Sequence, residues 1–425
     1  MNPIKNIAII GLGYVGLPLA IEFGKKFKTI GYDTDLKRIQ NLKNNIDSNK
    51  EISSTDIRKS KKLSFKNNIH DLKNIDMFII TVQSPILENK TPDLSYIKKA
   101  TEEVSSVMKK KSFIVYESTV YPGATENYFL PILEKKSKLK LNKDFYLGYS
   151  PERTNPGDKK NKITDIIKVV SGSNDYALGV INEVYRSIIK AGTYKAKTIK
   201  VAEASKVIEN IQRDLNIALM NELSIIFSKL ELDTNDVLNC AKTKWNFNNY
   251  YPGLVGGHCI GVDPYYLTYI SKQHGYKPNV ILSGRNINDK MYIHIVNLFL
   301  KELKKKNPKL KKPKILIMGY TFKENVTDTR NTQVENMINF LKKKNFYNLD
   351  VYDPNVNLED IKNPIKKIFI KKLVKFKYDG VIISVKHDKF IKFGSKYIKN
   401  LLRNDRGLIF DVKGILGNDK NIIKL

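Results

Sequence analysis

The sequence predicts an α/β protein in which two doubly wound, parallel-sheet domains are joined by a central helical domain with a long helix. Three observations support this. Strand-like apolar runs alternate with amphipathic segments over the first 200 residues, and the same alternation resumes after residue 312. Between them, Ala202 to Leu232 contains no Pro or Gly. Alternating strand and helix patterns are typical of parallel sheets. We therefore place the domains at residues 1–200, 201–305 and 312–425.

Short apolar runs supply the strands of the first domain, and one longer run supplies its first helix, at Val15 to Phe27. Residues 44–70 are polar and Lys-rich, so we expect them to leave the sheet. The expected strands are Ile7 to Ile10, Thr29 to Tyr32, Met77 to Val82, Phe113 to Tyr116 and, less clearly, Phe145 to Tyr149 and Val169 to Ser171.

Apolar residues at helical spacing, such as Val207, Ile211 and Leu215, predict one helix of about 30 residues in the Pro- and Gly-free stretch. Lys301 to Lys314 is charged and contains two prolines, so we expect a linker there. Further helices are expected at Asp236 to Ala241, Tyr265 to Gln273 and Val280 to Leu303, a glycine-rich loop at Trp245 to Gly261, and later strands at Ile315 to Met318, Leu349 to Tyr352, Gly380 to Val385 and Leu408 to Phe410.

The 425-residue chain carries 74 Lys and Arg against 43 Asp and Glu, a net charge of +31. Only nine of these cations are Arg, the side chain suited to bidentate contacts with phosphate and guanine. The lysines lie in short runs along the whole chain, as at Lys109 to Lys111. This pattern favours a solvated Lys surface over a surface for nucleic acid or an anionic membrane. We expect neither nucleic acid nor a membrane as a partner.

Two cysteines, Cys240 and Cys259, are too few for a disulfide framework, which favours a cytoplasmic protein. The uncharged stretch from Ile7 to Ile21 is too short to span a bilayer, and we expect no leader peptide before it. Neither cysteine has the Cys/His spacing of a zinc site, so no metal is expected.

Gly11-Leu12-Gly13-Tyr14-Val15-Gly16 follows a predicted strand and precedes a predicted helix. In a Rossmann-like domain these glycines allow a tight turn and let a pyrophosphate approach the helix N-terminus. Asp33 ends the second strand, 17 residues after Gly16, where a carboxylate accepts a hydrogen bond from a ribose hydroxyl. The acid favours NAD over NADP, because it would repel a 2′-phosphate. Arg38, on the next helix, weakens that preference.

Cys259 lies in Gly256-Gly257-His258-Cys259-Ile260-Gly261, just before a predicted helix and four residues before Asp263. A thiol in such a loop is accessible and ionises more easily near a helix N-terminus, which favours a nucleophile. His258 is a possible base, although its side chain could equally point away. Cys240 lies within a helix among apolar neighbours, so we expect it to pack in the core.

Polar groups also gather at other predicted strand ends and on the long helix. Lys206 and Asn210 are four residues apart on one helix face, where a cation and an amide can hold an oxyanion. Periodicity alone does not separate them from a solvated pair. The other groups are Glu117-Ser118-Thr119, Ser150-Pro151-Glu152-Arg153 and Gly319 to Asn325 with Arg330 downstream, the last suited to a second phosphate-bearing ligand.

These motifs occur in one order along the chain, and from end to end the sequence resembles the UDP-glucose/GDP-mannose dehydrogenase family of nucleotide-sugar 6-dehydrogenases. The matching segments are Gly11 to Gly16, Glu117 to Val120, Ser150 to Arg153, Gly256 to Cys259 and Thr321 to Asn325. The sequences of the segments Trp245 to Phe247 and Pro252 to Leu267 are most similar to the branch that acts on UDP-N-acetylglucosamine or UDP-N-acetylgalactosamine in surface-polysaccharide synthesis.

The resemblance implies a four-electron oxidation of a sugar CH2OH to a carboxylate with two NAD molecules in succession. It implies that Cys259 forms a thiohemiacetal and then a thioester, and that Lys206 and Asn210 stabilise the oxyanion. Asp263 and Thr119 would position water, and Glu152 would be the general base. The long helix would form the core of a homodimer.

The resemblance also implies two sets of binding residues. The cofactor-binding set is Gly11, Gly13, Tyr14, Val15, Gly16, Asp33, Arg38, Thr81, Thr119 and Arg330, with Arg330 on the cofactor side of an interdomain cleft. The substrate-binding set is Glu152, Arg153, Lys206, Asn210, Tyr250, Gly256, Gly257, Phe322, Lys323 and Lys413, with Lys323 on the UDP pyrophosphate.

Two segments depart from the family pattern. Thr81-Val82-Gln83-Ser84-Pro85 replaces the usual Thr-Val-Pro-Thr-Pro, and Lys413 follows Asp411-Val412 where the UDP-glucose branch usually has Arg. The second difference favours an acetamido sugar over UDP-glucose, although UDP-glucose 6-dehydrogenase remains the nearest alternative. A non-catalytic, NAD-responsive binding protein is a remote one, because it would not need Cys259, Lys206 and Lys323 together.

Overall fold

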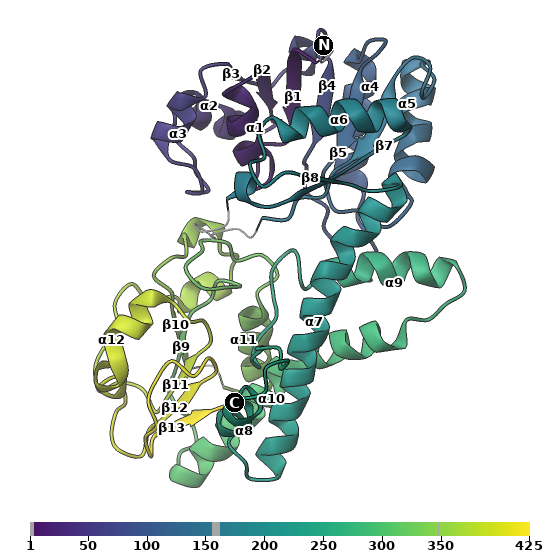
Figure 1. Cartoon of the computed structure of the whole chain (residues 1–425). Helices are drawn as coiled ribbons and strands as arrows, with labels where there is room; N and C mark the ends of the chain where they lie inside the picture. The colour runs from purple at the N-terminus through teal and green to yellow at the C-terminus, as the bar shows by residue number, and fades with distance from the viewer. Residues whose placement is uncertain (1–3, 155–161, 347) are drawn as a thin grey trace. The chain divides into compact units, whose positions relative to one another are not determined.

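The computed structural model describes residues 4–154, 162–346 and 348–425, and it divides into two compact units (Figure 1). The N-terminal unit comprises Met1–Glu209 and Tyr265–Lys277. The C-terminal unit comprises Asn210–Pro264 and Pro278–Leu425. Each unit contains its own sheet, which confirms the predicted α/β class with two doubly wound sheets and a helical region between them in the sequence.

The N-terminal unit is built on a sheet with the strand order β3-β2-β1-β4-β5-β6-β7-β8, parallel except for the antiparallel pair β6 and β7. The order 3-2-1-4-5-6 is that of a dinucleotide-binding sheet, and its direction reverses between β1 and β4. Ligands bind such sheets at this switch point, beyond the carboxyl ends of the strands. The strands are β1 Asn6–Ile10, β2 Lys28–Tyr32, β3 Leu63–Lys66, β4 Met77–Ile80, β5 Phe113–Tyr116, β6 Tyr146–Tyr149, β7 Lys168–Gly172 and β8 Thr193–Lys195.

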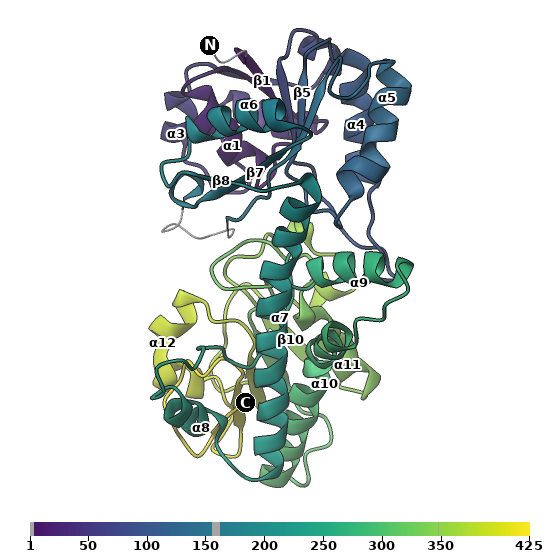
Figure 2. The ribbon, with the colours of Figure 1, turned by 45° about the vertical axis from the view of Figure 1, so that its right-hand side comes forward.

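Helices cover this sheet because its strands are apolar on both faces. One set of alternating strand residues packs in a single cluster with α1 and α6, which lie close together in Figure 2. On the other face, Tyr116 stacks on Phe129 and its hydroxyl lies 2.9 Å from that of Thr101 on α4. The helical segments are α1 Gly16–Gly24, α2 Leu36–Lys43, α3 Ser54–Lys59, η1 Ile69–Leu72, α4 Ser95–Val107, η2 Thr125–Phe129, α5 Leu130–Ser137, η3 Ile163–Asp165 and α6 Asp175–Arg186.

One part of the predicted first domain was wrong. Residues 44–70 do not leave the sheet entirely, because β3 pairs in parallel with β2. Only Phe65 of this edge strand is buried, so its sequence lacks the apolar run of an internal strand. The predicted helix at Val15 to Phe27 is also shorter, because α1 ends at Gly24.

The central region contains the long helix that the sequence predicts. This helix, α7, spans Ile199–Lys229, and α8 Thr234–Ala241, α9 Asp263–Gln273 and α10 Asn279–Lys306 follow it. The predicted linker at Lys301 to Lys314 starts too early, since α10 continues to Lys306. The last turns of α10 are rich in Lys but remain helical, because Phe299 and Leu303 lie on a buried face of the helix.

The C-terminal unit has an all-parallel sheet with the order β10-β9-β11-β12-β13. One face packs against α10 and α11, and the other against α12. The elements are β9 Ile315–Met318, α11 Gln333–Lys343, β10 Leu349–Tyr352, η4 Leu358–Asp360, η5 Ile365–Ile368, β11 Gly380–Ile383, α12 Asp388–Lys399, β12 Leu408–Asp411 and β13 Ile422–Lys424. In the part of the chain that the structure describes, no helix has the length and apolar character needed to cross a membrane.

Candidate active site

The glycine-rich loop connects β1 to α1 at the switch point of the N-terminal sheet. A Cβ added at Gly16 would overlap the carbonyl oxygen of Gly11, so only glycine allows the helix to start this close to the strand. Gly13 is exposed, and an added Cβ there would meet nothing within 4 Å. The loop therefore has a tight base and an open outer side beside a helix N-terminus, which fits a dinucleotide pyrophosphate.

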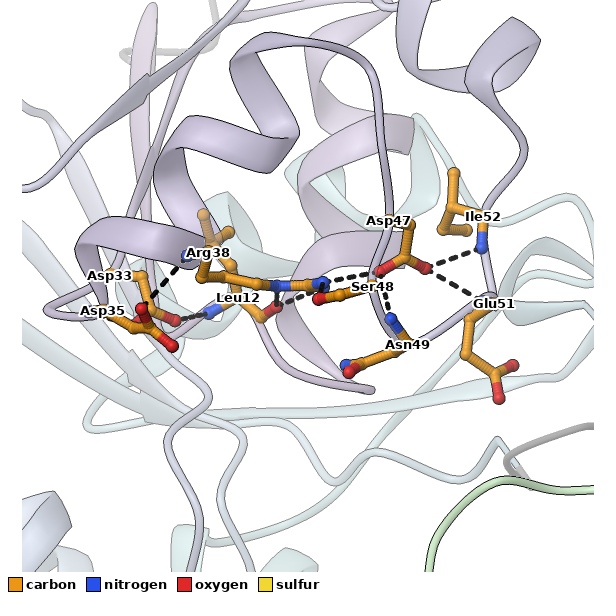
Figure 3. Close-up of polar contacts among 9 residues, drawn as sticks. All are labelled: Leu12, Asp33, Asp35, Arg38, Asp47, Ser48, Asn49, Glu51 and Ile52. Carbon is orange, nitrogen blue, oxygen red and sulfur yellow. Dashed lines mark hydrogen bonds and ion pairs between the residues drawn. The ribbon is translucent and has the colours of Figure 1, made fainter. Parts of the chain in front are cut away.

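The peptide of Leu12, inside this loop, is held on both sides by charged side chains (Figure 3). Its N–H donates to Oδ2 of Asp33 at 2.8 Å. Its carbonyl accepts from Nε of Arg38 at 3.0 Å and from an Nη of Arg38 at 2.8 Å. Asp33 lies at the end of β2 and is partly exposed, so it can also accept from a ribose hydroxyl. Arg38 is buried beneath the loop, and its contact with the cofactor stays a prediction.

The carboxyl ends of β4 and β5 bring two more predicted residues to this edge. The Thr81 hydroxyl donates to the carbonyl of Gly11 at 2.7 Å, which ties β4 to the loop. Ser118 donates to the carbonyl of Val82 at 2.5 Å, and Thr119 follows it, partly exposed. Thr81 and Thr119 therefore both lie where ligands bind such sheets.

A buried charge cluster lies behind the same edge, and it includes Glu152. Nζ of Lys168 lies 2.7 Å from Oε2 of Glu117 and 3.3 Å from Oε2 of Glu152. The hydroxyl of Tyr185 donates to the other oxygen of Glu117. Oε1 of Glu152 accepts from the backbone N–H groups of Arg153 at 2.7 Å and Thr154 at 2.5 Å. One cation therefore joins two buried carboxylates.

The cluster gives its two carboxyl groups opposite pKa shifts. Burial by itself raises the pKa of Glu152, but Lys168 and the hydrogen bonds of Thr154 outweigh burial, and the pKa falls below its usual value. Lys206 contributes to this fall. Burial raises the pKa of Glu117 in spite of Lys168. Glu152 is consequently ionised at neutral pH, the protonation state that a general base requires.

The first turns of α7 carry further polar residues of the N-terminal unit. Arg153 pairs with Glu209 at 2.7 Å and also donates to the carbonyl of Ile167 at 3.1 Å. Glu203 accepts from the N–H groups of Gly123 and Thr125 just after β5. Burial raises the pKa of Glu203 to about 7. These contacts fix the start of α7 to the strand end that carries Thr119.

In the C-terminal unit, Asn210 and Asp263 form a buried pair. Nδ2 of Asn210, on α7, donates to Oδ2 of Asp263 at 2.5 Å. Cys259 lies in the turn before α9, and its carbonyl accepts from the N–H groups of Val262 at 3.0 Å and Asp263 at 2.9 Å. The thiol residue is partly exposed, and Asp263 is buried. Two of the predicted catalytic residues, Asn210 and Asp263, are therefore in contact, and the backbone links Cys259 to Asp263.

The sequence left the orientation of His258 open and placed Cys240 in the core, and the structure shows the surroundings of both residues. Nδ1 of His258 lies 3.5 Å from a carboxylate oxygen of Asp328, which also pairs with Arg330. His258 is thus engaged by an acid, and Arg330 belongs to the same group. Cys240 was expected in the core but is exposed, so that prediction was wrong. Leu238 is buried on α8, and a residue two positions later lies on the opposite side of a helix.

Several predicted substrate-binding residues meet in the C-terminal unit. Gly256, Phe322, Lys323 and Lys413 line one small pocket at the end of β9. Burial lowers the pKa of Lys413. Gly257 packs on Phe322 so closely that an added Cβ would lie 2.6 Å from its ring. Tyr250 is not among the residues that line this pocket.

The sequence analysis missed an acid that repeats the role of Asp33 in the second sheet. Asp353 follows β10, and its Oδ2 accepts from the N–H groups of Tyr320 at 2.6 Å and Thr321 at 3.0 Å. The buried His387 ring lies 3.1 Å from the same oxygen. The signal was available, because Asp353 stands directly after a strand, as Asp33 does. Lys168 and Glu203 gave no such signal.

Family comparisons cover most of the chain. Residues 5–189 match the NAD binding domain of the UDP-glucose/GDP-mannose dehydrogenase family, residues 200–290 its central domain and residues 316–418 its UDP binding domain. The chain is 47% identical over 420 residues to a UDP-N-acetyl-D-glucosamine 6-dehydrogenase of Pseudomonas aeruginosa, covering 99% of each. It is 48% identical over 423 residues to the protein CapL of Staphylococcus aureus, covering 98% of this chain and 97% of CapL. Among solved structures, UDP-D-ManNAc dehydrogenase of Pyrococcus horikoshii superposes with a TM-score of 0.88 at 28% identity, covering 99% of this chain and 98% of that one.

Proposed function

The chain belongs to the UDP-glucose/GDP-mannose dehydrogenase family and is an NAD-dependent nucleotide-sugar dehydrogenase, and from this premise we propose that it oxidises C6 of a UDP-N-acetylhexosamine. The sugar is UDP-N-acetylglucosamine or UDP-N-acetylgalactosamine, and the product is the corresponding uronic acid, a precursor of a surface polysaccharide. The observation that carries the proposal is the identity of 47% to a UDP-N-acetyl-D-glucosamine 6-dehydrogenase over nearly the full length of both chains. Its three domains would lie at residues 1–200, 201–305 and 312–425.

The proposed reaction converts one CH2OH group and one water into a carboxylate and releases three protons. NAD, when bound, accepts a hydride in each of the two oxidations. Gly11, Gly13 and Gly16 would hold its pyrophosphate, Tyr14 and Val15 lie in the turn just before α1, and Asp33 would hold the adenosine ribose. The open side of Gly13 and the partly exposed position of Asp33 at the end of β2 support this assignment.

Cys259 acts on the aldehyde that the first oxidation produces. Its sulfur forms a bond to the carbonyl carbon, and the oxygen takes a proton to give a thiohemiacetal. The second oxidation removes a hydride from that carbon and a proton from its hydroxyl, and leaves a thioester. Water then attacks the thioester carbon, the carbon–sulfur bond breaks, and Cys259 leaves as the thiolate.

The remaining residues stabilise charge and move protons. Lys206 and Asn210 stabilise the negative oxygen of the tetrahedral species, and both are buried on consecutive turns of α7. Asp263 and Thr119 position the water, and Glu152 takes its proton. The low pKa of Glu152 supports the last role. The residues proposed to bind the UDP-sugar are Arg153, Tyr250, Gly256, Gly257, Phe322, Lys323 and Lys413. Those proposed to contribute to cofactor binding are Thr81, Arg38 and Arg330.

The stoichiometry of NADH tests the proposal directly. The purified protein is incubated with excess NAD and a limiting amount of UDP-N-acetylglucosamine, UDP-N-acetylgalactosamine or UDP-glucose, and NADH is counted by absorbance. We expect two NADH per UDP-N-acetylhexosamine and a kcat/KM at least about tenfold lower for UDP-glucose, which lacks the acetamide group. One NADH per sugar would contradict the thioester scheme. A preference for UDP-glucose would replace the proposed substrate with the alternative.

We also propose that the protein is a cytoplasmic homodimer with α7 at its interface. Large apolar residues on α7 are exposed at positions that share one helix face, namely Val201, Ile208, Leu219 and Ile226. Leu230, which directly follows the helix, is exposed as well. The opposite face, with Asn210, Asp214 and Asn221, is buried. An exposed apolar stripe of this kind marks an interaction surface.

Replacing Leu219 and Ile226 together by glutamate tests the interface. Two charges in an apolar interface are costly, so we expect the double variant to elute as a monomer while the wild-type chain elutes as a dimer. Light scattering coupled to gel filtration gives the masses. Lys304→Glu, an exposed position on α10, is the matched control and should remain dimeric. A dimer of unchanged stability in the double variant would refute the role of this face.

A further inference from the structure

A buried ion pair lies below the glycine-rich loop, and one of its members belongs to no motif. Nη1 of Arg38 lies 2.6 Å from Oδ1 of Asp47 and 2.9 Å from the hydroxyl of Ser48 (Figure 3). The Asp47 side chain is fully buried and that of Arg38 is 8% exposed. Asp47 lies in the polar segment after α2, far from every catalytic motif in the sequence. Desolvating an Arg–Asp pair is costly, and removing one partner would leave the other charge buried without compensation.

All three nitrogen atoms of the Arg38 guanidinium donate hydrogen bonds. Nε and one Nη donate to the Leu12 carbonyl at 3.0 and 2.8 Å. The other Nη donates to Asp47 and Ser48. Arg38 thus connects the glycine-rich loop to the segment that contains Asp47, and the position of the Arg38 guanidinium depends on the Asp47 carboxylate.

Asp47 is itself fixed by the backbone that follows it. Its Oδ1 accepts from the N–H of Asn49 at 3.1 Å, and its Oδ2 accepts from those of Glu51 and Ile52, both at 2.9 Å. Three N–H groups and one guanidinium therefore surround the carboxylate. This arrangement makes Asp47 a rigid anchor and not a mobile surface acid.

We propose that Asp47 is a positioning and specificity-determining residue, which holds Arg38 on the Leu12 carbonyl so that the loop is preorganised for NAD and the guanidinium is withheld from a ribose 2′-phosphate. An arginine beside the ribose acid is the residue that accommodates NADP in dinucleotide-binding sheets. In this protein Arg38 has the right place in the sequence for that task, but its donors are directed to Leu12, Asp47 and Ser48. The inference depends on NAD binding and not on which sugar is oxidised.

Binding of NAD and NADP to the protein without sugar, measured by titration calorimetry, tests the role. In Asp47→Asn we expect the Kd of NAD to rise about tenfold, because the isosteric amide loses the charge that holds Arg38. The ratio of the Kd of NADP to the Kd of NAD should fall about tenfold, since a released guanidinium can meet the 2′-phosphate. Arg38→Met should raise the Kd of NAD similarly without lowering that ratio, and the double variant should show less than the sum of the two effects.

Two further variants keep the test decisive if Asp47→Asn is unstable. Arg38→Lys retains a positive charge for Asp47 but lacks the planar guanidinium that donates two hydrogen bonds to the Leu12 carbonyl. This variant should bind NAD about as weakly as Arg38→Met. Arg285→Met breaks an equally buried pair with Asp214 in the C-terminal unit, and it should lower the melting temperature with no change in the NAD affinity. An unchanged Kd of NAD in Asp47→Asn and Arg38→Met would overturn the proposal. An equal fall of the ratio of the Kd of NADP to the Kd of NAD in both variants would also overturn it, because Arg38 would then play no part in the change.

Discussion

Cys259→Ser is expected to abolish the second oxidation and leave the first one measurable. Serine is a far weaker nucleophile than a thiolate and an ester is a poorer intermediate than a thioester, so the rate of carboxylate formation should fall by roughly 10³-fold or more. The NADH yield in a single turnover should drop from two to about one per sugar, with the aldehyde retained or released. Rapid quench with mass spectrometry of the sugar, alongside NADH absorbance, measures both quantities.

The chain offers a matched control for this substitution. Cys240 is its other cysteine and is exposed on α8, so Cys240→Ser should leave the rate and the NADH yield unchanged. Mass spectrometry of the wild-type protein trapped with substrate should show the acyl adduct on Cys259 alone. Full four-electron turnover by Cys259→Ser would remove this residue from the nucleophilic role.

Lys168→Met should give the second large effect, because Lys168 is expected to act as a positioning residue through its contact with Glu152. Lys168 lowers the pKa of Glu152, so its loss raises that pKa and leaves the base protonated over a wider range. The acid limb of the kcat/KM profile should move to higher pH. At pH 7 the rate should be lower by about 10- to 100-fold and should partly recover above pH 8.

The shape of the pH profile separates this role from simple destabilisation. A folding defect would lower the rate at all pH values, whereas loss of the cation moves one limb. Lys168→Arg, which keeps the charge, should restore the wild-type limb if the larger side chain fits. Lys109→Met removes an exposed partner of Asp76 in the same unit and should leave the profile in place. An unmoved acid limb in a folded Lys168→Met variant would show that Glu152 does not depend on Lys168.

Much of the candidate site could be predicted because its residues lie in short local patterns. The three glycines between Gly11 and Gly16 have the spacing that a strand–turn–helix connection requires. The position of Asp33 could be predicted because it ends the second strand of the first βαβ unit. Cys259 stands out since a cysteine in a glycine-rich loop differs from one within a helix. The same reasoning failed for Cys240, because periodicity shows that α8 has two faces but not which of them is covered.

The residues that the sequence could not indicate act through contacts with distant parts of the chain. Lys168 is one of 65 lysines, and nothing in its neighbours distinguishes it from a solvated one. Only the folded structure distinguishes Lys168 from the other lysines, because β7 places it beside Glu117 and Glu152. Asp47 is likewise one acid in a polar, Lys-rich segment, and its partner Arg38 is nine residues away across the end of α2.

The sequence by itself determined the fold class, the family and the chemistry, because apolar periodicity and glycine spacing are local properties that follow directly from backbone sterics. The tertiary structure alone decided which charged side chains are buried and with whom they pair. Burial and pairing set the protonation state of Glu152 and the direction of the Arg38 guanidinium, and both depend on segments that meet only after the sheet has formed. For that reason the candidate nucleophile, Cys259, could be proposed from its motif, whereas Lys168 and Asp47 required the folded chain.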